Sequence, residues 1–247
     1  MADGPERSEY FSLFVPVYNE EDILEENILQ IQKKLSSVCD DYHIYIVDDN
    51  SSDRTPALAG KMAKKYDWLT HLRYDTGPTR RENLGRSFYK AGGKIIGFMD
   101  LDLATDLKHT KNLISEIEAG ADIAIGSRYL KRSTRSRRIS RHMISIIFNN
   151  IVRFLFRTGI KDHECGFKSF KRKIILELLG ELGYDEDLKR SVFWDAELLI
   201  RAKRKGYKIT EFPIDWFERK KSALNFGREK SMVPYMLKLR FSRKLSK

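Results

Sequence analysis

The sequence predicts an α/β protein built around a mainly parallel, Rossmann-like central sheet. Through the first half of the chain, short apolar runs alternate with longer segments of helical pattern, which is typical of strands joined by helical crossovers. Polar and acidic residues follow several of the apolar runs. Because open parallel sheets bind their ligands at the carboxyl edge of the strands, we expect the functional site there.

Strands and helices are expected to alternate strictly in this half. The apolar runs that we assign to strands are residues 11–15, 43–47, 69–74, 95–99 and 122–125. The helices expected between them are residues 20–35, 54–65, 83–91 and 110–119. Acidic residues in the first turn favour the first helix through its dipole, and residues 50–53 offer candidate caps for the second.

The second half of the chain has a different character. Residues 131–141 are strongly basic and carry neither strand nor helix pattern, so we expect a loop. In residues 141–157 a polar residue recurs every four positions among Ile and Phe residues, which predicts an amphipathic helix with a broad apolar face. A helix over residues 194–205 and a strand over residues 208–214 are expected next, followed by a basic amphipathic tail.

Charge and composition narrow the class of partner. The chain has 247 residues, and its 46 Lys and Arg against 35 Asp and Glu give a net charge of +11. This excess suggests an anionic partner, such as nucleic acid, a membrane surface or a phosphorylated substrate. The two cysteines form no disulfide framework, the N-terminus lacks a signal-peptide core, and no run reaches the ~18–20 apolar residues of a membrane span. We therefore expect a cytoplasmic protein that can touch a membrane without crossing it.

Two carboxylates one residue apart, Asp100 and Asp102, follow the strand expected over residues 95–99. Hard oxygen ligands at this edge suit Mg²⁺ or Mn²⁺ carrying a phosphate-bearing substrate. A lone pair of this kind is also common on solvated surfaces. Arg80 and Arg81 follow the third strand and could reach a diphosphate at the same edge, although a solvated basic turn is the simpler interpretation of that pair.

Two acidic loops point to the same edge, PVYNEE after the first strand and VDDNSSD after the second. Tyr18 could lie against a nucleobase. A carboxylate from Asp48 or Asp49 could accept hydrogen bonds from a base or a ribose. The alternative is a turn with an Asx-type helix cap, which explains the second loop without a ligand.

These motifs, with GSRY at 126–129, CGFK at 165–168 and WDAE at 194–197, occur in an order that resembles family 2 glycosyltransferases of GT-A fold. The dolichyl-phosphate or polyprenyl-phosphate mannose and glucose synthases are the most similar group, over roughly residues 11–240. The resemblance implies one catalytic domain over residues 1–247. Its expected parts are a nucleotide-sugar half over 8–130, an acceptor half over 131–230 and the basic amphipathic tail over 231–247.

The resemblance also implies a reaction, the inverting transfer of a hexose from a UDP- or GDP-linked donor to dolichyl or polyprenyl phosphate at the cytosolic membrane face. The residues implied for the nucleotide-sugar are Pro16, Tyr18, Glu20, Asp48, Asp49, Arg81 and Asp100. Asp100 and Asp102 would bind the cofactor, Mg²⁺ or Mn²⁺. Arg128 would face a phosphate, and Asp195 would lie near the acceptor.

An acceptor phosphate, with a second pKa near ~6, is already an anionic nucleophile at neutral pH. Asp195 would then orient the acceptor or the sugar, whereas a sugar hydroxyl as acceptor would require it to act as a base. Its structural alternative is an acid at a helix N-terminus. The residues expected at the acceptor or the membrane surface are Arg135, Arg137, Arg138, Trp194 and Ser222. A core helix after a solvated loop is the alternative for this region.

The chain departs from the family pattern at Ala104, where many polyprenyl-phosphate mannose synthases carry a metal-binding Gln. The competing function within the same class is a family 2 transferase that acts on a soluble saccharide or a protein-linked glycan. A sugar nucleotidyltransferase is disfavoured because the first loop, residues 16–21, has no glycine to cradle phosphates. A nucleic-acid binder is disfavoured because it leaves the acidic loops unexplained.

Overall fold

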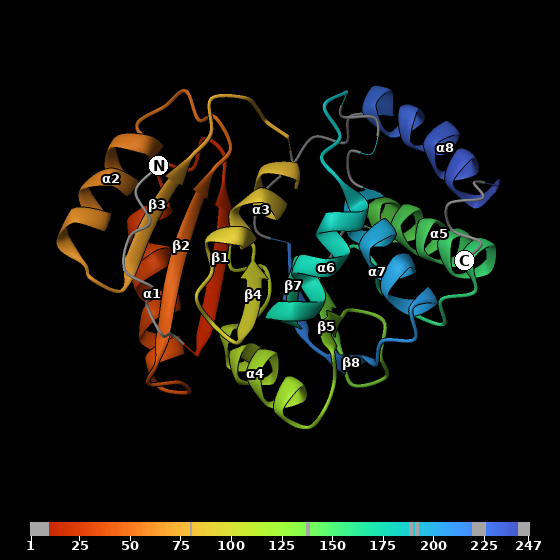
Figure 1. Ribbon diagram of the computed structural model, residues 1–247, viewed down its shortest axis with the longest axis horizontal. Helices are drawn as coiled ribbons and strands as arrows, with labels where there is room; N and C mark the ends of the chain where they lie inside the picture. Colours follow the sequence, from red (N-terminus) through yellow and green to blue (C-terminus); the bar gives the residue numbers. More distant parts are fainter. Residues whose placement is uncertain are drawn as a thin grey trace.

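The computed structural model describes residues 10–79, 81–136, 139–187, 190, 193–218 and 226–241. Its centre is a seven-stranded sheet with the order β3-β2-β1-β4-β7-β5-β8 (Figure 1). The strands are β1 (Phe11–Val17), β2 (Tyr42–Asp48), β3 (Leu69–Arg73), β4 (Ile95–Met99), β5 (Ile123–Ser127), β7 (Phe167–Lys171) and β8 (Ile209–Pro213). All pairs are parallel except those that β7 makes with β4 and β5. The prediction of a mainly parallel sheet is confirmed.

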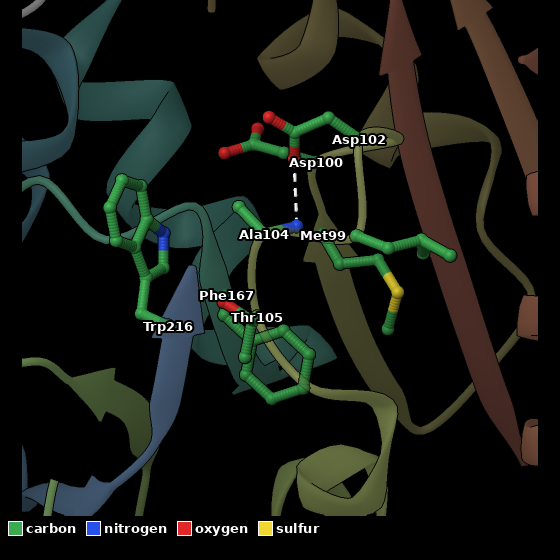
Figure 2. Close-up of a pocket in the computed structure, with 8 residues that line it drawn as sticks. Met99, Asp100, Asp102, Ala104, Thr105, Phe167 and Trp216 are labelled. Carbon is green, nitrogen blue, oxygen red and sulfur yellow. Dashed lines mark hydrogen bonds between the residues drawn. The ribbon is translucent and has the colours of Figure 1, made fainter. Parts of the chain in front are cut away.

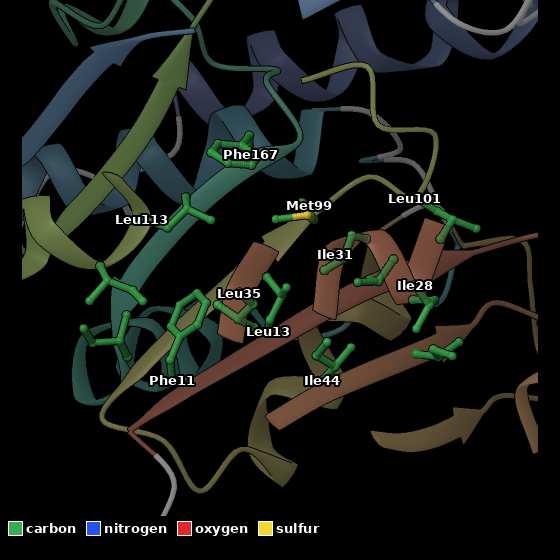
Figure 3. Packing of buried hydrophobic residues seen from close by; sticks show 14 of the residues in the cluster. Phe11, Leu13, Ile28, Ile31, Leu35, Ile44, Met99, Leu101, Leu113 and Phe167 are labelled. Atoms are coloured by element: carbon green, nitrogen blue, oxygen red, sulfur yellow. The ribbon is translucent and has the colours of Figure 1, made fainter. Parts of the chain in front are cut away.

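Helices cover both faces of the sheet. Apolar side chains of α1 (Leu24–Ser36), α2 (Thr55–Lys65) and α4 (Thr110–Glu118) pack on one face, and Figure 3 shows Ile28, Ile31 and Leu35 of α1 against Leu13 of β1. The other face is covered by α3 (Glu82–Ser87), α6 (Arg172–Leu182) and α7 (Trp194–Arg204). The strands alternate between the two clusters because successive side chains point to opposite faces.

Two further helices lie against α7. A third apolar cluster joins α7 to α5 (Ile139–Phe156) and α8 (Phe226–Phe241). The hydroxyl of Tyr235 on α8 donates to Oε2 of Glu197 on α7 at 2.7 Å, which fixes the position of α8. Among the described residues, none of the helices combines the length and the apolar character that crossing a membrane requires.

Several boundaries differ from those predicted. The first helix begins at Leu24 rather than at residue 20, because the N–H groups of Ile23 and Leu24 close a turn on the carbonyl of Glu20. The helix expected over residues 83–91 divides into α3 and a short 3-10 segment, Phe88–Lys90. The N-cap residue of α2 is Arg54, which makes no side-chain cap, but Oδ1 of Asp53 accepts the N–H of Thr55 at 2.9 Å, so the predicted segment does cap the first helical residue.

The largest differences lie in the second half. The expected basic loop over residues 131–141 contains a short strand, β6 (Thr134–Ser136), which pairs with β9 (Asp215–Phe217), and α5 already begins at Ile139. The sequence pattern gave no sign of β7 or α6. The sequence of β7 mixes Phe with Lys and Ser, and such polar residues are not expected in a central strand. Lys168 and Ser169 are nevertheless fully buried, because β7 lies inside the sheet between β4 and β5.

Candidate active site

The two acidic loops that follow β1 and β2 are joined by hydrogen bonds. Oδ1 of Asn19 accepts the N–H of Ser52 at 2.8 Å, and the N–H of Asn19 donates to Oγ of Ser51 at 3.0 Å. The N–H of Glu20 donates to Oγ1 of Thr55 at 2.8 Å. Tyr18, on the first of these loops, is 42% exposed. The predicted residues Tyr18 and Glu20 therefore lie on a loop that is held in place by hydrogen bonds to the second acidic loop and to the start of α2.

The carboxylates of Asp48 and Asp49 are both buried and have protein partners. Asp48 accepts the N–H of Ser51 at 2.9 Å and lies 3.6 Å from Nε2 of His71. Burial alone raises the pKa of Asp48, but the contacts with His71 and Ser51 outweigh it and hold the pKa below its ordinary value. Asp49 accepts the N–H and the hydroxyl of Thr79 at 2.7 and 2.9 Å, and the side-chain amide of Asn83 at 2.7 Å. These contacts fit the structural alternative for the second acidic loop.

Asp100 and Asp102 lie just beyond β4, in a small pocket that also contains Trp216 of β9 and Phe167 of β7 (Figure 2). Oδ1 of Asp102 accepts the N–H of Ala104 at 3.0 Å, which is drawn as a dashed line in Figure 2. The N–H of Asp100 donates to the carbonyl of Gly166 at 3.1 Å. The side chain of Asp100 is 48% exposed, so its carboxylate is accessible to a ligand.

Asp100 and Asp195 are joined by Arg81. Nη2 of Arg81 lies 3.0 Å from Oδ1 of Asp100, and Nε lies 3.3 Å from Oδ2 of Asp195. Burial lowers the pKa of Arg81, but the two carboxylates outweigh it and raise the pKa above its ordinary value. Only 15% of the Arg81 side chain is exposed, so the solvated basic turn is corrected for this residue.

The other oxygen of Asp195 is held by Lys168, which the sequence analysis left without a role. Nζ of Lys168 lies 2.7 Å from Oδ1 of Asp195 and also donates to the carbonyl of Cys165. Lys168 is fully buried beside the ring of Phe98, and the guanidinium of Arg81 lies over the same ring. One fully buried cation, Lys168, and one partly buried cation, Arg81, therefore fix the two oxygens of Asp195 at the start of α7.

Arg128 lies in a buried ion pair. Its Nε and Nη2 each lie 2.7 Å from an oxygen of Asp162, and its N–H donates to the same carboxylate at 2.9 Å. Burial alone raises the pKa of Asp162, but Arg128 outweighs it and keeps the pKa below its ordinary value. In the structure Arg128 therefore pairs with Asp162, whereas the resemblance implied that it would face a phosphate.

The residues predicted for the acceptor or membrane surface divide into two groups. Trp194 is 1% exposed and packs with the core on the α3 and α6 side of the sheet, so its expected place at a surface is corrected. The first turn of α7 directs this ring inward, where its edge lies close to Gly85. Arg135 is the middle residue of the short strand β6. Arg137, Arg138 and Ser222 lie outside the described residues.

The carboxylate pair fits a hard divalent cation that shares its coordination with a substrate. The described part of the chain holds no group of three or more His, Cys, Asp or Glu side chains arranged for a metal. Mg²⁺ commonly takes one or two carboxylates and completes its shell with phosphates and water. Asp100 and Asp102 supply two carboxylates, Asp100 is accessible, and Ala104 adds no ligand. These residues would hold Mg²⁺ or Mn²⁺ together with a diphosphate.

Comparison with known sequences gives one family. The profile of "Glycosyl transferase family 2" matches residues 12–179. Glycosyltransferase AglD of Haloferax volcanii is 34% identical over 208 residues, which is 83% of this chain and 32% of that protein. Polyprenol monophosphomannose synthase of Mycolicibacterium smegmatis is 30% identical over 84% of this chain and 77% of its own length. The dolichyl-phosphate beta-glucosyltransferase of Saccharomyces cerevisiae is 29% identical over 85% and 67%. The chain thus spans about one third of the first relative and most of the other two.

Solved structures share the fold. The mannosyltransferase PcManGT from Pyrobaculum calidifontis, in complex with GDP-Man and Mn²⁺, superposes with a TM-score of 0.59 and 18% identity, covering 96% of this chain and 64% of that one. Glucosyl-3-phosphoglycerate synthase from Mycobacterium tuberculosis, in complex with Mn²⁺ and UDP-glucose, gives 0.63 and 17%, covering 94% and 79%. At these identities the likeness concerns the fold, and it confirms the predicted GT-A class.

Proposed function

Because this chain belongs to glycosyl transferase family 2, we propose that it transfers a hexose from a nucleotide-sugar to the phosphate of a polyprenol, with inversion at the sugar. The observation that carries the choice of acceptor is the state of Asp195. Both of its oxygens already accept from cations, Lys168 at 2.7 Å and Arg81 at 3.3 Å. A carboxylate held in this way is poorly placed to take a proton from a sugar hydroxyl, whereas an anionic phosphate needs no base.

The donor would bind along the carboxyl edges of β1, β2 and β4. Tyr18 offers an exposed ring to the nucleobase, with Pro16 near the end of β1 before it and Glu20 after it on the loop. Asp100 and Asp102 would hold Mg²⁺ or Mn²⁺ against the diphosphate. When bound, the cation supplies positive charge that stabilises the departing nucleoside diphosphate. The solved structures of similar fold that hold GDP-Man or UDP-glucose support a GDP- or UDP-linked donor. The relatives named as polyprenol monophosphomannose synthase and dolichyl-phosphate beta-glucosyltransferase support the lipid phosphate acceptor.

A lipid acceptor requires the protein to reach a membrane surface, and α5 and α8 offer a face for it. These neighbouring helices lie at one end of the molecule in Figure 1. Their exposed apolar side chains include Met143, Ile147, Phe154, Leu237 and Phe241, with exposed fractions of 83% for Phe154 and 79% for Phe241. Basic residues stand among them, at Arg153, Arg157, Lys238 and Arg240. We propose that this face lies in the interface of an anionic membrane.

The reaction is tested by incubating the protein with polyprenyl phosphate in detergent, Mn²⁺ or Mg²⁺, and a panel of UDP- and GDP-sugars. We expect an extractable sugar-lipid from one donor, and we expect it to vanish with EDTA. If no lipid product forms while a donor still binds, the acceptor is a soluble saccharide or a protein-linked glycan.

The membrane face has its own test, co-sedimentation with vesicles that contain anionic lipid. Phe154→Ser and Phe241→Ser together should weaken binding by about tenfold or more, since burying such a side chain contributes roughly 1.5–3 kcal/mol. Tyr89→Ser is the matched control, because Tyr89 is also an exposed aromatic residue, at 53%, but it lies in the 3-10 segment Phe88–Lys90 and not on α5 or α8. Equal loss in both variants, or no loss in the double variant, would contradict this placement.

A further inference from the structure

The contacts of Arg81 connect it to a residue that the proposed function assigns to the metal. Its Nη2 lies 3.0 Å from Oδ1 of Asp100, which is the more exposed carboxylate of the pair. The guanidinium of Arg81 and a divalent cation would both be attracted to the negative charge of the Asp100 carboxylate. Resting on the proposed function, we propose that Arg81 and the metal compete for Asp100, and that Arg81 passes from this carboxylate to the diphosphate of the donor when the metal binds.

The surroundings of Arg81 allow such a transfer. Nε remains 3.3 Å from Asp195, so the guanidinium keeps one anchor when the contact at Nη2 is lost. Asp195 is itself fixed by the fully buried Lys168, which also donates to the carbonyl of Cys165. The guanidinium also packs over the ring of Phe98, whose centre lies 5.1 Å from the guanidinium carbon. Arg81 is thus held at one end and exchangeable at the other.

The proposal assigns Arg81 two effects of opposite sign. By pairing with Asp100 it weakens metal binding, because two ligands that share one partner oppose each other. By turning its free N–H groups to the diphosphate it strengthens donor binding, since charge-assisted hydrogen bonds to phosphate oxygens are among the strong ones. If Arg81 had a merely structural role, its substitution would weaken both metal binding and donor binding.

The test measures Mn²⁺ binding by the decrease of the free-ion EPR signal, without nucleotide, and then UDP and GDP binding at saturating Mn²⁺. We expect Arg81→Gln to bind Mn²⁺ more tightly by up to about fivefold, the upper end of the range for loss of a partly exposed ion pair. The same variant should bind the preferred nucleoside diphosphate at least about tenfold more weakly. Arg81→Lys keeps the charge but cannot reach both carboxylates with one nitrogen, so its Mn²⁺ affinity should lie between the two.

Arg86→Gln is the matched control, because it removes the same charge from α3, where Arg86 contacts the rings of Tyr74 and Tyr184. It should leave both affinities unchanged. Unchanged or weaker Mn²⁺ binding in Arg81→Gln and Arg81→Lys overturns the competition, and so does an equal tightening in Arg86→Gln. Unchanged nucleotide binding in Arg81→Gln overturns the transfer to the diphosphate. Neither result depends on the lipid, so failure of the proposed acceptor is distinguished by the transfer assay alone.

Discussion

Gly166 determines where the carboxylate of Asp100 can lie. A Cβ atom built on Gly166 would stand 1.9 Å from Oδ2 and 2.5 Å from Cγ of Asp100. Ordinary van der Waals contact begins near 3.4 Å, so Gly166→Ala must displace the carboxylate by about 1.5 Å. Because Asp100 is half exposed, its side chain can rotate into solvent without moving the backbone. The substitution should therefore disturb the metal position and leave the fold in place.

The expected sizes of the two effects differ widely. Displacement of a reacting geometry by about 1 Å can cost about 100-fold in rate, so we expect at least that loss of transfer in Gly166→Ala. Stability should change by less than about 1 kcal/mol, since losing a half-exposed ion pair with Arg81 costs little and Ala restricts the unfolded chain. Initial rates of sugar-lipid formation and urea unfolding measure the two quantities.

Gly180→Ala is the control for adding a methyl group at a glycine. Gly180 lies in α6, and a Cβ there would meet no atom within 4 Å. Because alanine is favoured over glycine inside a helix, this variant should gain roughly 0.5–1 kcal/mol and keep its activity. A rate for Gly166→Ala within about threefold of wild type would refute the account of Asp100. A rate loss that simply follows the unfolded fraction would refute it as well.

Two further predictions concern the pocket and the core. Asp102→Ala should abolish transfer with little loss of stability, because the carboxylate makes a local hydrogen bond to the N–H of Ala104; turnover and urea unfolding of this variant check both parts. His163 is buried between Thr158 and Asn149, and burial lowers its pKa to about 4. The unfolded chain binds this proton with a pKa near 6.5, so the stability from a neutral His163 is present above that value and is lost as the pH falls towards about 4. Urea unfolding at about pH 7.5 and about pH 5 should differ by about 2 kcal/mol more in wild type than in His163→Gln, and equal differences would count against it.

The sequence predicted what depends on local pattern. β4 has the predicted bounds, 95–99, because five apolar residues are buried on both faces of the sheet, and Asp100 follows where the chain leaves the core. Turn and cap patterns were less reliable at element ends, where hydrogen bonds such as those on Glu20 decide the first helical residue.

What the sequence did not predict depends on partners far along the chain. Arg81 in isolation fits a solvated turn, and its contacts with Asp100 and with Asp195, 114 residues later, make it part of the site. Lys168 in isolation argues against a central strand, since a buried ammonium is costly unless it is paired. Its partner is the same Asp195, which reaches it from the first turn of α7.

The antiparallel strand β7 explains why the two halves of the chain form one site. β7 lies between β4 and β5, with Phe167 opposite Met99 and Lys168 opposite Phe98. Its first residues therefore arrive at the carboxyl edge of β4, where the carboxylates follow. Gly166 is thereby placed against Asp100, and Lys168 is placed beneath Asp195. The CGFK motif is thus the turn and first step of a strand that joins the predicted donor half to the predicted acceptor half. Substitutions in it should affect donor and acceptor steps together.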